Sequence, residues 1–224
     1  KGGLGGTLGA LATPVMALVL PPEQVVGMLL PVLMFADVFA VSWHWKRWDR
    51  KQILLLLPGA IAGITIGTFF ITNAPEGSLR LTLGIIVILF VIYRLVENWL
   101  KQRLYKPRSW HGVFAGTVAG FSSALAHTGG PPVSMYLLMQ DLPPKSFVAT
   151  SALFFAIVNW IKVPYYFYAG LFDLSRLLTI FWMLPLVPLG VWHGRKLSER
   201  VDKRTFEHII TALLVAAAVL LIIG

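Results

Sequence analysis

The sequence predicts an all-α integral membrane protein made of two inverted repeats, each a Gly/Pro-broken re-entrant segment followed by three transmembrane helices. Three observations support this fold class. The 224 residues are 57% hydrophobic and only 13% charged, whereas soluble domains carry about 25% charged residues. Six segments are long and apolar enough to cross a bilayer. The basic residues, 19 against 10 acidic ones, gather in three connections.

The same composition excludes several classes of protein. A soluble globular enzyme or a disordered chain carries far more charge. The chain has no cysteine, which excludes a disulfide scaffold, thiolate metal sites and cysteine nucleophiles. The sequence also contains no HExxH, nucleophile-elbow or Walker motif. We therefore expect no enzyme, no cofactor and no metal site.

Each expected element follows from its apolar length. The six candidate spans are residues 24–43, 52–71, 79–99, 146–169, 174–192 and 206–224. Two further apolar stretches, 2–20 and 110–142, are interrupted by Gly and Pro. The second breaks at HTGGPP, residues 127–132, because its prolines remove amide donors and its glycines favour other backbone angles.

The order of these pieces occurs twice. Pro21-Pro22 matches Pro143-Pro144 at an offset of 122 residues, and Leu57-Pro58 matches Leu184-Pro185 at an offset of 127. Residues 1–105 and 106–224 are therefore predicted as two repeats within one membrane domain. The chain opens inside the first broken segment, so we expect about a dozen further residues, a first half-helix, upstream of it.

The basic connections test how each broken segment lies in the membrane. They are residues 44–51, 94–108 and 195–204. If each broken segment crossed the membrane once, the basic residues would divide 10 against 7 between the two sides. If each is a re-entrant hairpin, the division is 15 against 2. The hairpin obeys the positive-inside rule far better, and it gives each half three crossings and hence the opposite orientation.

Two polar residues lie in the middle of matching apolar helices. Asp37 and Asn159 are separated by the repeat offset of 122. Ionisable residues at membrane depth are costly and usually functional. We predict that Asp37 exchanges a proton or holds a cation while Asn159 hydrogen-bonds the substrate. The alternative is a polar clasp between helices, worth about 1 kcal/mol.

The broken segments offer a second candidate site. Backbone amides at the N-terminus of a half-helix attract anions, although Gly and Pro would also serve simply to shape a tight turn. His127 would hold an anion when protonated, or cap a half-helix when neutral. The substrate-binding candidates in these segments are Gly2, Gly3, Gly5, Gly6, His127, Thr128, Gly129, Gly130 and Pro131.

Two lysines are candidates to neutralise an anionic substrate. Lys1 precedes the first glycine pair, where it would face the break or form a frayed end. Lys162 lies three residues after Asn159 and so on roughly the same helix face. It would neutralise an anion or pair with Asp37, or it would extend along the helix towards the membrane surface.

The ordered set of motifs in both halves resembles the TauE/SafE sulfite exporter family. It comprises the glycine pairs after Lys1, Pro21-Pro22, Asp37, LPG at 57–59, HTGGPP at 127–132 and LPP at 142–144. The resemblance implies a multi-pass transporter of the bacterial inner membrane. Its substrates would be small sulfur-containing anions such as sulfite, sulfoacetate or related organosulfonates, with a proton as coupling ion.

The sequence thus predicts a secondary transporter of small anions that works by alternating access, with the three basic connections in the cytoplasm. The expected partners are the anionic substrate, the lipid bilayer, a proton or cation for coupling and a second copy of the chain in a homodimer. Nucleic acid is not expected, since topology explains the positive charge. An anion channel and a non-transporting membrane scaffold or assembly protein remain as alternatives.

Overall fold

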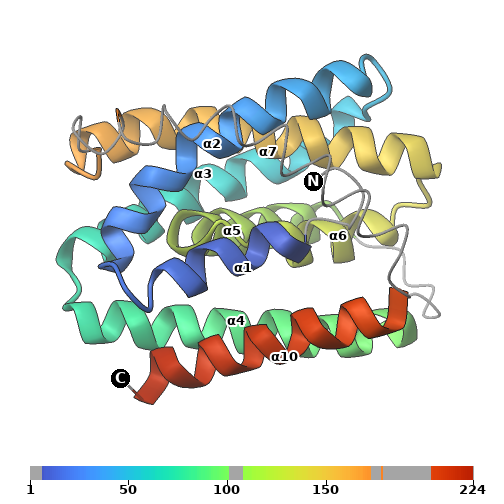
Figure 1. Ribbon diagram of the computed structural model, residues 1–224. Helices are drawn as coiled ribbons and strands as arrows, with labels where there is room; N and C mark the ends of the chain where they lie inside the picture. The colour runs from blue at the N-terminus through green and yellow to red at the C-terminus, as the bar shows by residue number, and fades with distance from the viewer. Residues whose placement is uncertain (1–6, 101–107, 173–177, 179–202, 224) are drawn as a thin grey trace.

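The computed structural model describes residues 7–100, 108–172, 178 and 203–223, and every element within them is an α-helix (Figure 1). In chain order the helices are α1 (Thr7–Met16), α2 (Pro22–Trp43), α3 (Arg50–Asn73), α4 (Glu76–Leu100), α5 (Ser109–Ala126), α6 (Gly130–Leu138), α7 (Pro144–Tyr168) and α10 (Lys203–Ile223).

The helices confirm most of the expected spans. Four of the described helices are long and apolar enough to cross a membrane: Pro22–Trp43, Arg50–Asn73, Glu76–Val96 and Pro144–Tyr168. They correspond to the first four predicted segments, and α10 covers the sixth. The predicted segment 174–192 lies outside the described residues, apart from Leu178.

Local chemistry explains where several helices begin. Pro21 and Pro143 are the N-caps of α2 and α7, with nearly the same backbone angles (φ −56°, ψ 134° and φ −54°, ψ 144°). A proline follows each at the first helical position, where its missing N–H costs nothing. At the start of α3, the Asp49 carboxylate accepts hydrogen bonds from the backbone N–H groups of Lys51 and Gln52 at 2.8 and 3.2 Å.

The second broken segment is a helical hairpin, α5–α6. The break occupies residues 127–129 only, because Gly130, Pro131 and Pro132 already form the first turn of α6. The predicted break at 127–132 was therefore too long. Prolines are compatible with a first helical turn, where their missing N–H groups have no intrahelical acceptor to bond.

The hairpin returns to the end of the bundle from which it starts, seen on the right of Figure 1. Gly112, near the start of α5, lies beside the Tyr136 hydroxyl near the end of α6. That hydroxyl donates to Gln52 Oε1 in the first turn of α3 at 2.8 Å. The start of α7 lies there too, since the Asp49 N–H donates to Thr150 Oγ1 at 2.9 Å. The starts of α3, α5 and α7 thus define one end of the bundle, called here the basic end.

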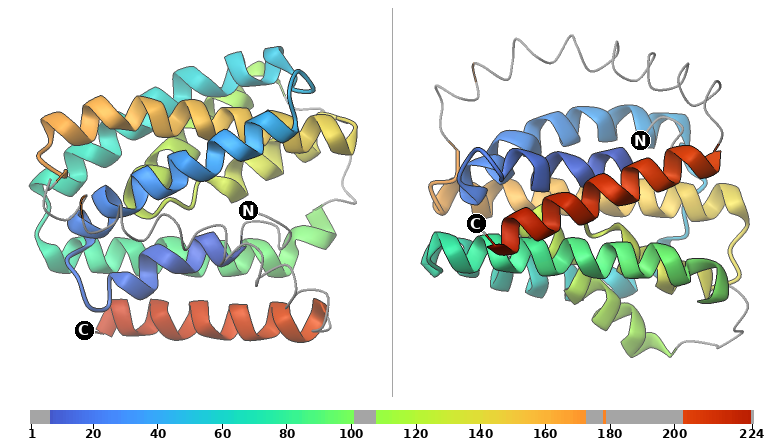
Figure 2. Two further views of the ribbon diagram at one scale, coloured as in Figure 1. Left: turned by 45° about the horizontal axis from the view of Figure 1, so that its top comes forward. Right: turned by 60° about the horizontal axis from the view of Figure 1, so that its bottom comes forward.

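The ends of α4 and α10 agree with the distribution of basic residues that the sequence predicts. Helix α10 runs antiparallel to α4, with Gly84 of α4 against Ala218 and Ile222 of α10 (Figure 2). Lys203 at the start of α10 is therefore at the basic end, with Arg50, Arg108 and Lys145. Arg80, near the start of α4, lies at the opposite end.

The helix pair α3–α5 packs with its backbones almost in contact. The two helices run parallel, and a Cβ on Gly63 would collide with the carbonyl of Thr117, as one on Gly116 would with the carbonyl of Leu56. Small residues permit such close approach between helices in lipid. This pair joins the first half of the chain to the hairpin of the second.

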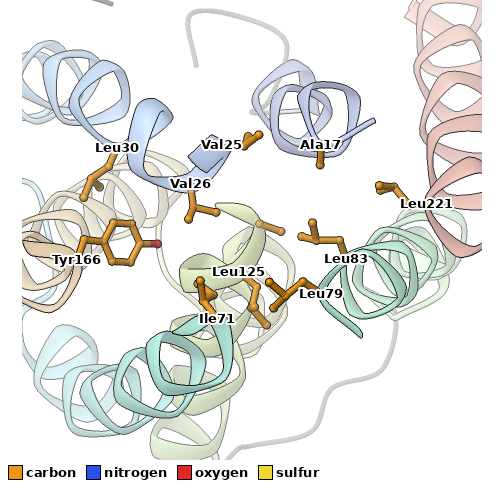
Figure 3. Packing of buried hydrophobic residues seen from close by; sticks show 11 residues of the cluster. Ala17, Val25, Val26, Leu30, Ile71, Leu79, Leu83, Leu125, Tyr166 and Leu221 are labelled. Carbon is orange, nitrogen blue, oxygen red and sulfur yellow. The ribbon is translucent and has the colours of Figure 1, made fainter. Parts of the chain in front are cut away.

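The described residues form three apolar clusters. One of them joins α3, α5, α6 and α7 through side chains such as Leu56, Ala119 and Phe154. The largest one, at the end opposite the basic end, gathers side chains from α2, α3, α4, α5, α7 and α10 with Ala17 after α1 (Figure 3). A smaller cluster joins α4 to α10 and contains Val87, Val91, Leu214 and Ala218. Val87 and Leu214 are 127 positions apart, as are Val91 and Ala218.

Candidate functional site

Asp37 and Asn159 meet in the middle of the antiparallel pair α2–α7. The Asn159 amide nitrogen donates to Asp37 Oδ2 at 2.6 Å, and both side chains are buried, with 3% and 4% of their surface exposed. This contact is the interhelical clasp that was one of the two expectations. It brings the two predicted residues together, while the proposed roles in coupling and substrate binding stay predictions.

Lys162 is fully buried one turn along α7 from Asn159. Its ammonium nitrogen lies 3.2 Å from the Ser123 carbonyl oxygen, 3.1 Å from Ser123 Oγ and 2.9 Å from His127 Nδ1. It also lies 5.9 Å from the centre of the Tyr166 ring. The expectation that Lys162 extends to the membrane surface is therefore wrong, because hydrogen-bond acceptors at the hairpin tip hold its charge inside the bundle.

His127 caps the end of α5 and joins three helices. It adopts the left-handed conformation (φ 54°), which His tolerates better than most side chains do. Its Nε2 lies 3.0 Å from the Val26 carbonyl oxygen of α2, an acceptor only, so Nε2 carries the proton. Nδ1 then accepts from Lys162. The hydrogen bonds assign His127 as the neutral Nε2–H tautomer, which corresponds to the neutral cap among the two expectations.

The hairpin tip is more tightly built than a free anion-binding loop. Thr128 is buried, and its N–H donates to the Ser122 carbonyl at 3.4 Å. A Cβ on Gly129 would approach Ala119 O to 2.6 Å, so this glycine serves close packing. Around Gly130, by contrast, no atom of the described residues lies within 4 Å of such a Cβ, apart from its chain neighbours and the backbone of α6 itself.

Pro131 and Pro132 limit what the N-terminus of α6 offers an anion. A helix begins with four backbone N–H groups that lack an intrahelical acceptor. The two prolines carry none, so only Gly130 and Val133 supply amides within the first four residues of α6. Side chains therefore have to provide much of any anion site at this tip.

Part of the predicted site lies outside the described residues. Lys1, Gly2, Gly3, Gly5 and Gly6 belong to that part, and their assignment as substrate-binding residues stays a prediction. Within residues 7–100, 108–172 and 203–223, no three His, Asp or Glu side chains come together as a metal site.

Sequence reasoning missed Ser123, which places two oxygen atoms within hydrogen-bond distance of the Lys162 ammonium. It is 3% exposed and lies one helical turn before His127 on α5. A signal was present, since Ser122-Ser123 is a hydroxyl pair inside an apolar span one turn before the break. It lacked weight because serine is common at helix contacts in membranes.

The comparisons with known proteins agree with the chemistry of a membrane transporter. The family model "Sulfite exporter TauE/SafE" matches residues 1–221. No curated protein and no solved structure matches the chain. The family match spans both halves, including the hairpin and the helix that carries Asn159 and Lys162. The chain therefore belongs to the TauE/SafE sulfite exporter family.

Proposed function

We propose that the protein is a secondary transporter of small anions, with sulfite, sulfoacetate or related organosulfur anions as substrates. The observation that carries the proposal is the buried Lys162 ammonium at the tip of a broken hairpin. Burying a charged side chain at membrane depth costs free energy, and the residues that do so usually have a function. The family to which the chain belongs is one of sulfite exporters, and an anion is the ligand that a buried cation recognises.

The proposed binding site lies between the hairpin tip and α7. Lys162 supplies charge, and His127, Thr128 and Asn159 supply polar groups. The backbone of Gly129, Gly130 and Pro131 forms the wall on the α6 side. The repeat offset of 122 makes Lys1 the equivalent of Ser123, which supports a contribution from the first broken segment, with Gly2, Gly3, Gly5 and Gly6 beside it.

The proposed mechanism is alternating access, which is typical of transporters built from inverted repeats. Contacts and conformations of equivalent residues in the two halves support inverted repeats. The matching N-caps Pro21 and Pro143 share one backbone conformation, and the α4–α10 cluster pairs residues that are 127 positions apart. A helix that packs on its own equivalent across a two-fold axis in the membrane plane packs antiparallel to it, as α2 does on α7 and α10 does on α4. An anion channel would not need this symmetry, and a scaffold would not need a buried lysine.

Asp37, which accepts the hydrogen bond from Asn159, is the proposed coupling group. A proton or cation bound there would offset the charge of the anion while the helices move. The basic end is proposed to face the cytoplasm, since connections rich in Lys and Arg remain on that side. This orientation would suit the inner membrane of a bacterium.

A binding screen on the purified full chain tests the function. Sulfite, thiosulfate, sulfoacetate, taurine and simple carboxylates are compared for their effect on thermal stability, because a ligand that prefers the folded state raises it. At least one sulfur anion should stabilise the wild type and not Lys162→Met. Lys145→Met, which removes an exposed lysine from the first turn of the same helix, should respond as the wild type does.

Flux measurements then separate a transporter from its rivals. In liposomes, a transporter should show saturable flux at ordinary turnover rates. Flux several orders of magnitude faster would support a channel. Absence of both flux and stabilisation with every anion would contradict the transport function and favour a scaffold.

A further inference from the structure

We propose that His127 is a proton-binding residue that gates the access of the anion to Lys162, so that each anion is bound together with one proton. This inference rests on the proposed anion transport and deepens it. It assigns a proton to the anion's own site, in addition to the coupling role proposed for Asp37.

The first step is the number of donors on Lys162. An ammonium group has three N–H donors. Within the part of the chain that the structure describes, Ser123 O, Ser123 Oγ and His127 Nδ1 lie 3.2, 3.1 and 2.9 Å from the Lys162 nitrogen, which is enough acceptors for all three donors. In this arrangement the donors of the buried lysine are directed at the protein. An anion that is to bind the ammonium has to replace one of these acceptors.

The second step identifies the acceptor that can be withdrawn. The two Ser123 oxygens stay acceptors at any pH. His127 Nδ1 accepts only while the imidazole is neutral, because Nε2 already carries the proton that is donated to Val26 O at 3.0 Å. A second proton on Nδ1 makes it a donor, which ends its hydrogen bond with Lys162 and turns both groups towards any acceptor between them.

The third step couples the proton to the anion. A protonated His127 beside Lys162 puts two positive charges within hydrogen-bond distance in a buried site, an arrangement that an anion between them would stabilise. Binding of the anion and of the proton therefore favour each other, and the coupling is reciprocal. Oxyanions fit best, since they accept hydrogen bonds from both donors at once.

Other titratable groups lie on the helices around this pair. The Tyr166 hydroxyl, on α7, donates to Ala124 O at 2.6 Å. The Asp37 carboxylate, on α2, accepts from Asn159. On α5, Ser123 adds no charge. His127 is thus a side chain whose protonation directly changes a hydrogen bond of Lys162.

Proton uptake on anion binding tests the proposal. The purified full chain in weakly buffered detergent solution is titrated with sulfoacetate, which has no group that titrates between about pH 6 and pH 8. A pH-sensitive dye reports proton uptake, and calorimetry reports affinity. The wild type should take up about one proton per anion at the alkaline end of this range. Its affinity should fall up to about tenfold for each unit of pH increase there.

Two variants remove the titrating group. His127→Gln keeps a neutral hydrogen-bonding side chain, and His127→Asn suits the left-handed backbone better. Both should bind sulfoacetate without proton uptake and with an affinity that does not depend on pH. His208→Gln, which replaces an exposed histidine on α10, should keep the wild-type proton uptake.

The outcomes separate this inference from the function on which it rests. Sulfoacetate binding without proton uptake in the wild type would overturn the role of His127 and leave anion transport standing. Proton uptake that persists in both His127 variants would do the same, and its loss in Asp37→Asn would move the proton to Asp37. If neither sulfoacetate nor sulfite binds the wild type, both proposals fail.

Discussion

The amide of Asn159 donates a 2.6 Å hydrogen bond to the carboxylate of Asp37, and the two residues are 122 positions apart, the same spacing that separates the Pro-Pro pairs at the starts of their helices. In the proposed inverted-repeat architecture, a residue that touches its own repeat equivalent lies near the axis that relates the repeats. Under the proposed alternating access, contacts on such an axis would be preserved when the two halves exchange conformations. We therefore predict that the pair acts as a pivot for α2 and α7.

Exchange of the two residues tests this relationship. Asn159→Leu should lower the free energy of unfolding by about 1–3 kcal/mol, because it removes a hydrogen-bond donor from a buried carboxylate. The double variant Asp37→Asn/Asn159→Asp restores one donor and one acceptor across the same contact, so it should recover most of the loss in a thermal unfolding assay. Failure of the double variant to exceed Asn159→Leu in stability would contradict the pivot.

Cysteine labelling tests the re-entrant hairpin, and the natural absence of cysteine makes the wild type a clean background. Arg108→Cys and Lys145→Cys flank the hairpin on exposed positions, and Gly77→Cys marks the opposite end. A membrane-impermeant thiol reagent applied to one side of intact vesicles should label the first two together and Gly77→Cys only from the other side. Labelling of Arg108→Cys and Lys145→Cys from different sides would mean a full crossing.

The packing of α3 on α5 should tolerate no side chain at Gly63. A Cβ there meets the carbonyl of Thr117, and a backbone cannot move aside as a flexible side chain can. Gly63→Val should cost at least about 1–3 kcal/mol of stability or abolish folding. The measurement is thermal unfolding in detergent, followed by size-exclusion chromatography. Gly77→Ala, whose Cβ would meet no atom within 4 Å from described residues outside its own stretch of helix, should unfold like the wild type.

The hydrogen bond between Tyr136 and Gln52 should hold the return arm of the hairpin in place. Tyr136→Phe removes the 2.8 Å bond and leaves the Gln52 acceptor buried, so we expect a loss of about 1 kcal/mol in a thermal unfolding assay. Tyr168→Phe is the matched control, since Tyr168 is 87% exposed. An equal effect of both variants would argue against a specific role for the Tyr136 bond.

Arg80 should contribute more to stability than its partner Glu76. The guanidinium donates to the Ala17 carbonyl at 2.7 Å beyond α1 and also pairs with Glu76. Arg80→Met removes both interactions, whereas Glu76→Gln weakens only a partly exposed ion pair worth about 0–1 kcal/mol. Thermal unfolding should rank Arg80→Met clearly below Glu76→Gln, and the reverse order would contradict the bond to Ala17 as the main contribution.

Hydropathy and charge predicted the helices well because membrane spans depend on length and apolarity, which are local properties. The spans carrying Asp37, Asn159 and Lys162 were placed correctly, and the offset of 122 indicated that the first two correspond. The hairpin followed from the distribution of Lys and Arg, and its return beside Tyr136 agrees with that reasoning.

Side-chain partners within the site could not be predicted in the same way. Lys162 is long enough either to reach a membrane surface or to turn inwards, and only the position of α5 decides between them. Ser123 and the Val26 carbonyl act through contacts between helices that are distant in sequence. The tautomer of His127 depends on its hydrogen-bond partners, the Val26 carbonyl and the Lys162 ammonium. Neither of them belongs to the HTGGPP motif.

The backbone-to-backbone contact between α3 and α5 bears on how such a chain can be divided. Helix α3 comes from the first half of the sequence, yet among the described helices it packs most closely on α5, in the hairpin of the second half. The halves are interlocked in space even though they are separate in sequence. Either half produced without the other would expose a strip of glycine that only its partner covers. We therefore expect that the two halves fold only together, as one unit.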